Sequence, residues 1–75
     1  MLEDVTTYRV RFELDDTGWY AVTIPSVPGC ITQARTVHEG LVLVRDALAL
    51  IAGDDVAAQA ELLAEVVGAS EPRAA

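Results

Sequence analysis

A chain of 75 residues with twelve acidic side chains, five arginines and no lysine carries a formal net charge of −7. This balance argues against direct binding of DNA or RNA, which needs a basic surface, and it suits a basic protein partner instead. One cysteine and one histidine exclude an internal disulfide and a structural zinc site with Cys and His ligands, so we expect no metal and no cofactor.

The length predicts a single domain, residues 1–75, with its core at about residues 6–53. Hydrophobic residues make up 52% of the chain, which is generous for so small a core and favours a homo-oligomer such as a dimer. Glu3 and Asp4 stand where a secretory signal would need positive charge, and no apolar run reaches the roughly 18 residues of a membrane span. We therefore expect a cytoplasmic protein that does not enter membranes.

Residues 8–14 alternate apolar and polar side chains, which is the period of a half-buried strand. A turn follows at residues 15–18, and residues 19–24 complete a hairpin. A three-residue loop would pair Phe12 with Val22 and gather the large apolar side chains on one face, whereas a two- or four-residue loop would scatter them. The opposite face would then carry Arg9, Arg11, Glu13, Trp19, Ala21 and Thr23.

Two prolines interrupt the chain at residues 25–29, and residues 30–35 predict a third strand. Thr36 and Glu39 have the spacing of a capping box, which marks the start of a helix that Gly53 is expected to end. Gly40 lies inside this helix, where glycine costs about 1 kcal/mol relative to alanine, so a close approach to the sheet would explain it. The apolar face of the helix is expected to consist of Val37, Leu41, Val44, Leu48 and Ile51.

Residues 55–67 predict a second, C-terminal helix with Asp54 as its cap, followed by a frayed tail at residues 68–75. The two apolar stripes of this helix would pack either on the same domain or on a second copy, and the small core favours the second copy. The residues expected at that dimer interface are Leu62, Leu63, Val66 and Val67. The expected fold class is therefore α+β, a three-stranded antiparallel sheet (β-β-β-α) with one helix on one face and a second helix after it.

Three motifs taken together resemble the HicB antitoxin family. They are the Asp-Asp-Thr-Gly-Trp turn at residues 15–19, the Pro-Ser-Val-Pro-Gly-Cys stretch at residues 25–30 and the Thr-Val-His-Glu helix start at residues 36–39. The resemblance covers residues 8–52. It implies a partial ribonuclease-H-like fold, no enzymatic activity, and binding to a small basic HicA-type ribonuclease toxin.

The chain also departs from the usual family pattern. Gly40 stands where alanine is usual, and the second carboxylate of the turn is shifted by one position. Relatives usually have a fourth strand after the helix, so a strand at residues 55–67 remains an alternative to the helix. Too few residues follow Gly53 for the helix-turn-helix unit of longer relatives, so direct DNA binding by this chain is not expected.

The candidate partner-binding residues are Arg9, Arg11, Asp15, Asp16 and Trp19. An exposed tryptophan between arginines is typical of a protein interface, although Trp19 would equally serve to cover the sheet near the turn. The paired aspartates are also typical of turn chemistry. Because these carboxylates do not converge with Glu13 and Asp46 as a two-metal nuclease site requires, no catalytic or metal-binding residues are expected.

Two functions remain after these exclusions. The first is the antitoxin of a type II toxin–antitoxin pair, which binds and occludes a HicA-type toxin. The alternative is an orphan HicB-like module, a self-associating regulator or scaffold that has no toxin.

Overall fold

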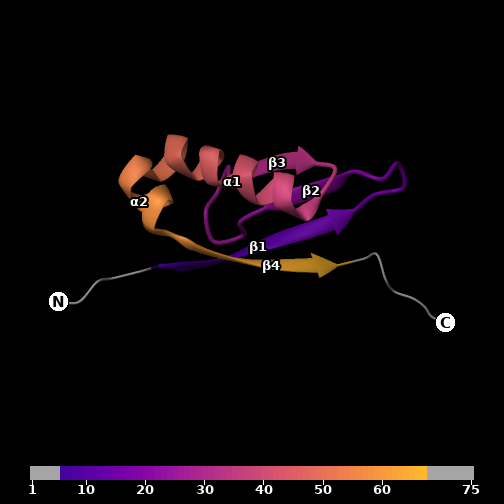
Figure 1. The fold of residues 1–75 in the computed structure, drawn as a ribbon, viewed down its shortest axis with the longest axis horizontal. Helices are drawn as coiled ribbons and strands as arrows, with labels where there is room; N and C mark the ends of the chain where they lie inside the picture. Colours follow the sequence, from indigo (N-terminus) through magenta and orange to yellow (C-terminus); the bar gives the residue numbers. More distant parts are fainter. Residues whose placement is uncertain (1–5, 68–75) are drawn as a thin grey trace.

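The computed structural model describes residues 6–67 as a four-stranded sheet with a long helix across one face (Figure 1). The elements in chain order are β1 (Thr7–Leu14), β2 (Tyr20–Thr23), β3 (Ile31–Ala34), α1 (Val37–Ala52), α2 (Asp54–Gln59) and β4 (Glu61–Val67). The strand order is β3-β2-β1-β4, with β2 antiparallel to both β1 and β3, and β4 parallel to β1. The frayed tail expected at residues 68–75 lies outside the described residues.

The β1–β2 hairpin has the register predicted from the sequence. Phe12 pairs with Val22, and the amide of Asp15 donates to the carbonyl of Trp19, which leaves a three-residue loop. Gly18 ends this loop with a φ of +92°, a left-handed conformation that favours glycine. The side chains that this register directs toward α1 are buried, namely Val10, Phe12, Val22 and Ile24.

The helix α1 begins at the predicted capping residues. The hydroxyl oxygen of Thr36 accepts a hydrogen bond from the amide of Glu39 at 3.0 Å, and the Glu39 carboxylate accepts one from the amide of Arg35 at 2.9 Å. Two backbone amides at the helix start are thereby satisfied. The helix ends at Ala52 as predicted, because Gly53 adopts a φ of +107°.

Gly40 marks a close approach between α1 and the sheet. A Cβ atom at this position would lie 2.3 Å from Cε2 of Phe12 and 3.1 Å from Cγ2 of Val22. Real Cβ atoms do not approach a neighbour to 2.3 Å, so only glycine lets α1 lie this close to β1 and β2. The predicted reason for a glycine inside the helix is therefore confirmed.

The helix expected at residues 55–67 is wrong for most of its length. Only Asp54–Gln59 are helical, and Glu61–Val67 form a strand beside β1. The sequence Leu-Leu-Ala-Glu-Val-Val fits both periods, because its apolar residues stand in adjacent pairs four positions apart. Pairing decides the outcome, since β4 satisfies backbone groups of β1 from Thr7 to Glu13 that would otherwise form an unpaired edge. The fold class is α+β as expected, but the sheet has four strands of mixed direction rather than three antiparallel strands.

Arg45 of α1 holds the junction between α2 and β4. Its guanidinium donates to the carbonyl oxygens of Ala57 and Ala60, the second at 3.1 Å. These carbonyls lie at the end of α2, where a helix leaves its last acceptors without partners. The chain then enters β4 at Glu61, whose amide donates to the carbonyl of Thr6 at 2.9 Å.

Candidate functional site

The sheet face away from α1, called the open face below, carries charged and aromatic side chains. Because paired residues point to the same side of a sheet, the strand registers place on this face Thr7, Arg9, Arg11, Glu13, Ala21, Thr23, Ile31, Gln33, Glu61, Leu63, Glu65 and Val67. Arg9 and Arg11 therefore lie where the sequence predicts.

Both of these arginines form ion pairs on the open face. Arg9 lies 3.5 Å from the carboxylate of Glu65 in β4, and Arg11 lies 3.5 Å from that of Glu13. The four side chains are about half or more exposed, so each pair contributes little to stability. They remain accessible to a partner that approaches this face.

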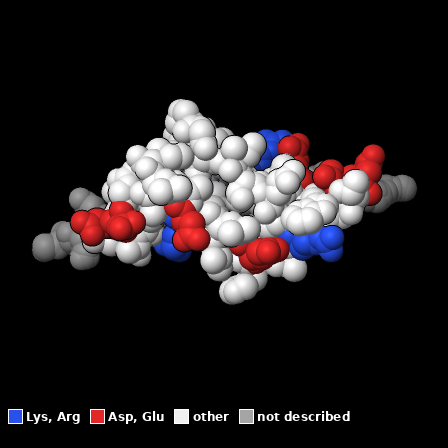
Figure 2. All heavy atoms as spheres, turned by 90° about the horizontal axis from the view of Figure 1, so that it is seen from above, with Lys and Arg blue, Asp and Glu red and all other residues white. Residues whose placement is uncertain are grey.

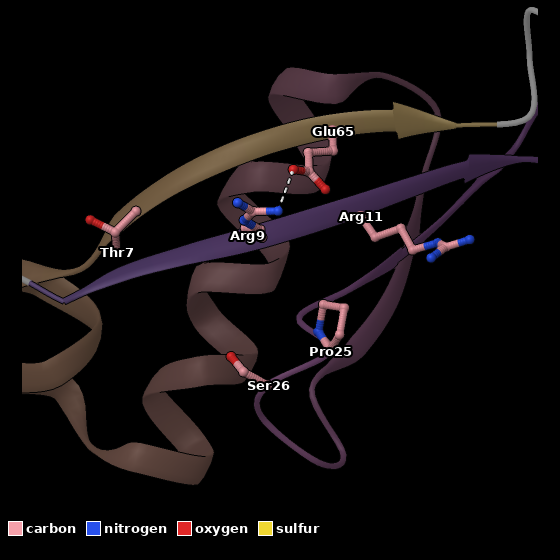
Figure 3. A pocket seen from close by; sticks show the side chains of 6 residues that line it. All are labelled: Thr7, Arg9, Arg11, Pro25, Ser26 and Glu65. Carbon is pink, nitrogen blue, oxygen red and sulfur yellow. Dashed lines mark ion pairs between the residues drawn. The ribbon is translucent and has the colours of Figure 1, made fainter.

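A shallow hollow lies between β1, β4 and the loop that follows β2 (Figure 3). Its lining residues are Thr7, Arg9, Arg11, Pro25, Ser26 and Glu65. In Figure 3, which shows α1 behind the strands, Arg9 reaches toward Glu65 and the guanidinium of Arg11 points away from that pair. The hollow thus offers hydroxyl, guanidinium and carboxylate groups for polar contacts.

Trp19 is half-buried beside the hairpin turn and carries an arginine on its ring. The guanidinium carbon of Arg35 lies 4.6 Å from the ring centre, which is a cation–π contact. Arg9 and Arg11 do not flank the tryptophan, because Arg11 pairs with Thr23 at the far end of β2. The expected placement of Trp19 between those two arginines is therefore corrected.

Arg35 is not among the candidate residues predicted from the sequence. Knowledge of the β2–β3 register, in which Tyr20 pairs with Ala34, would have identified it. One step further along both chains, the same register brings Trp19 opposite Arg35.

The carboxylate of Asp15 stabilises the hairpin turn. Its carboxylate accepts hydrogen bonds from the hydroxyl of Thr17 at 2.7 Å, from the amide of Thr17 at 2.8 Å and from the amide of Trp19 at 3.1 Å. The Thr17 hydroxyl is the main cause of a lowered pKa for Asp15, and the two amides lower it further. Of the two aspartates considered for partner contact, Asp15 thus has a turn role, whereas Asp16 is exposed at the tip.

The residues expected at a dimer interface do not share one helical stripe. They lie in β4, where alternation directs Leu62 and Val66 to the α1 side of the sheet and Leu63 and Val67 to the open face. Leu63 is 47% exposed and Val66 is 49% exposed. These side chains therefore border the outer edge of the sheet on both of its faces.

Negative charge is concentrated on the helices and the hairpin tip. Seen from the α1 side in Figure 2, acidic groups stand at both ends and along one border of a broad uncharged surface. On the helices of the described part, four acidic residues accompany the single arginine Arg45, namely Glu39, Asp46, Asp54 and Asp55. The open face is balanced instead, with Arg9, Arg11 and the neighbouring Arg35 against Glu13, Glu61 and Glu65.

Three general features of residues 6–67 limit the kinds of site that this part of the chain can form. Within this range no three His, Cys, Asp or Glu side chains are grouped so that they could hold a metal ion. No helix of the described part is long and apolar enough to cross a membrane. Cys30 is buried, burial raises the pKa of its thiol, and its Sγ lies 3.7 Å from the carbonyl oxygen of Val44.

Comparison with known proteins finds relatives over about half of the chain. A UPF0150 protein of Thermoplasma acidophilum is 39% identical over 41 residues, which is 55% of this chain and 59% of the relative. A UPF0150 protein of Archaeoglobus fulgidus is 40% identical over 43 residues, which is 57% of this chain and 62% of the relative. A protein of Photorhabdus laumondii subsp. laumondii named Antitoxin HicB 2 is 46% identical over 41 residues, which is 55% of this chain and 29% of the relative.

The chain thus matches about three fifths of the length of the first two relatives and less than a third of the last. No protein-family model matches the chain, and no solved structure matches it. The similarity to UPF0150 proteins and to a HicB antitoxin confirms the resemblance that the three motifs predict.

Proposed function

We propose that this HicB-like chain is the antitoxin of a type II toxin–antitoxin pair, and that it binds and occludes a small basic HicA-type ribonuclease toxin without catalysing a reaction. The observation that carries the proposal is the 46% identity over 41 residues to a protein named Antitoxin HicB 2. The proposed complex is cytoplasmic, and residues 1–75 act in it as one domain.

The topology supports the partial ribonuclease-H-like fold that the resemblance implies. Three antiparallel strands precede α1, and the strand after it returns to the sheet parallel to β1. Such a sheet would hold a toxin by shape and charge. Four of the described carboxylates already have structural partners, namely Asp15 in the turn, Glu39 at the helix cap, and Glu13 and Glu65 in surface ion pairs. In this proposal the chain does not bind DNA by itself.

The charge distribution supports a basic partner. The acidic hairpin tip, which borders the open face, would steer a toxin with a basic active-site surface toward the chain. Asp16 is an exposed carboxylate at that tip, and Trp19 supplies a large ring close to it. Aromatic and arginine side chains are the usual anchors of protein interfaces. We therefore place the toxin contact at Asp16, Trp19 and Arg35, with Arg9 and Arg11 as further contacts along the open face.

Coexpression tests this function. The full chain is produced together with the small basic protein encoded beside it, and copurification and protection of RNA from cleavage are measured. The expected result is a stable complex and an inactive ribonuclease. Failure to copurify, together with undiminished RNA cleavage, would refute the antitoxin role and favour the orphan self-associating module.

Two matched variants locate the contact. Asp16→Asn and Asp46→Asn each remove one exposed carboxylate, the first at the hairpin tip and the second on α1. We expect Asp16→Asn to slow association with the toxin and Asp46→Asn to change it less. Trp19→Ala should weaken the complex by at least tenfold, because truncating a hot-spot residue costs about 2 kcal/mol of binding free energy. An equal effect of the two Asn variants would place the contact elsewhere.

A further inference from the structure

The outer edge of β4 is the longest unpaired strand edge of the described sheet. Within residues 6–67, no strand pairs with it, and Figure 1 shows β4 at the margin of the sheet. The opposite edge strand, β3, has 4 residues, whereas β4 has 7. Proteins usually protect such edges with proline, lysine or a bulge, and β4 contains neither proline nor lysine.

Only every second residue of β4 directs its backbone amide and carbonyl groups toward this outer edge. The amide of Glu61 donates inward to the carbonyl of Thr6, so Glu61 and the residues at even steps from it bond to β1. Leu62, Ala64 and Val66 consequently direct their amide and carbonyl groups outward. These same three residues point their side chains to the α1 side, where Ala64 and Val66 are exposed.

We propose that this edge pairs with the β4 edge of a second copy of the chain, antiparallel, with Ala64 opposite Ala64 at the two-fold axis. The inference goes beyond the antitoxin role and does not depend on it. It replaces the helix-mediated dimer expected from the sequence with a continuous eight-stranded sheet made from two four-stranded ones.

The register follows from hydrogen bonding and charge together. With Ala64 at the centre, Leu62 lies opposite Val66 of the second copy, so all three outward-facing residues exchange backbone hydrogen bonds. If the two-fold axis passes through Leu62, only residues 61–63 of the two β4 strands are paired, and if it passes through Val66, only residues 65–67 are paired. Centring on Leu63 sets Glu61 opposite Glu65, and centring on Glu65 sets that residue opposite itself. Like charges directly opposite each other destabilise a strand pair, so the Ala64 register is favoured.

In this register the apolar side chains match on the α1 side, and no like charges lie directly opposite each other on the open face. On the α1 side, Leu62 and Val66 extend the apolar rows that they form with Tyr8 and Phe12 in β1. On the open face, Leu63 lies opposite Glu65 of the second copy, and each Glu65 keeps its ion pair with Arg9 of its own chain. Glu61 and Glu65 of different copies meet only on a diagonal, at about 7–8 Å.

The test begins with the mass of the purified full chain, measured across a concentration series by light scattering or sedimentation. Ala64→Pro removes an amide that faces outward and is not bonded to β1, and proline is tolerated at such edge positions. Ala64→Ser keeps the amide and is the matched control. We expect a dimer for the wild type and for Ala64→Ser, and a monomer with unchanged circular dichroism for Ala64→Pro. A monomeric wild type, or a dimeric Ala64→Pro variant that is folded, would overturn the proposal.

A cross-linking experiment tests the register and does not require the proline variant to fold. Residues opposite each other in a hydrogen-bonded antiparallel pair have Cα atoms about 5.5 Å apart, which a disulfide can bridge. Ala64→Cys should therefore form an intermolecular disulfide on oxidation. In Val66→Cys the two new thiols would be about 13 Å apart along the strands and should not cross-link. Equal cross-linking of both variants would refute the register, and none of these measurements involves the toxin.

Discussion

Replacing Gly40 by alanine should destabilise the chain, although alanine is the better helix former. An exposed helix position would gain about 1 kcal/mol from this change. Here the new methyl group would lie 2.3 Å from Cε2 and 2.9 Å from Cζ of Phe12, and 3.1 Å from Cγ2 of Val22. The added methyl group therefore has two opposing effects on the free energy of unfolding: higher helix propensity raises it, and overpacking of the core lowers it.

Overpacking should win, because the Phe12 ring has no room to move aside. Phe12 is fully buried, and its ring packs edge-to-face against Tyr20 with centroids 5.6 Å apart. Inserting a methyl group into such a core costs about 1–3 kcal/mol, and the short distances place Gly40→Ala toward the upper end. After the gain in propensity, we expect a net loss of about 2 kcal/mol. For a domain of this size that corresponds to a fall in Tm of roughly 10 °C.

Urea and thermal unfolding followed by circular dichroism measure this loss, and a double-mutant cycle identifies its cause. Phe12→Leu removes the ring atoms that the new methyl group meets, so Gly40→Ala should cost at least about 1 kcal/mol less when it is combined with Phe12→Leu. A higher Tm for Gly40→Ala would show that propensity dominates. An equal loss with and without Phe12→Leu would show that contact with the Phe12 ring is not the cause.

Three further predictions concern single side chains. Arg45→Met should lower the free energy of unfolding by about 1–3 kcal/mol in urea titrations, because the carbonyls of Ala57 and Ala60 lose a charged donor. An unchanged midpoint would contradict this role. Burial raises the pKa of the Cys30 thiol, so a thiol reagent should label it at pH 8 only in denaturant, and rapid labelling of the folded chain would disprove its burial. The lowered pKa of Asp15 stabilises the fold above the unfolded-state value of about 3.9, and this contribution is lost as the pH falls through the folded-state value. The urea midpoint of Asp15→Asn should therefore depend less on pH below about 5 than that of the wild type, and parallel profiles would refute the linkage.

The hairpin and the start of α1 could be predicted because their determinants are local. The register of β1 and β2 follows from a loop length that alone places Phe12 opposite Val22, and Gly18 has the conformation that this loop requires. Thr36 and Glu39 likewise satisfy amides within a few residues of themselves. Turn and cap chemistry of this kind is contained in a short segment of sequence.

The strand β4 could not be predicted from its own residues, because its determinant lies outside them, and only the family resemblance offered a strand as the alternative to the helix. Its apolar pairs suit a helix and a strand equally, and the unpaired edge of β1 selects the strand. The contact of Arg35 with Trp19 was missed for a related reason. The β2–β3 connection contains two prolines, and its sequence predicts no loop of defined length that would fix the register of the two strands. The sequence therefore does not predict that Trp19 lies opposite Arg35.

The pairing of β1 with β4 has a consequence for the timing of folding. Thr7 and Glu61 are 54 positions apart, and the Thr7 hydroxyl donates to the Glu61 carboxylate at 3.0 Å. Contacts of such long sequence separation slow folding, because the entropy of closing the loop is lost before the contact forms. A chain emerging from the ribosome can build the hairpin and α1 early, but β1 gains its second neighbour only after residue 67 has been made. A product truncated before Glu61 would keep the edge of β1 unpaired, and such an edge is a template for aggregation.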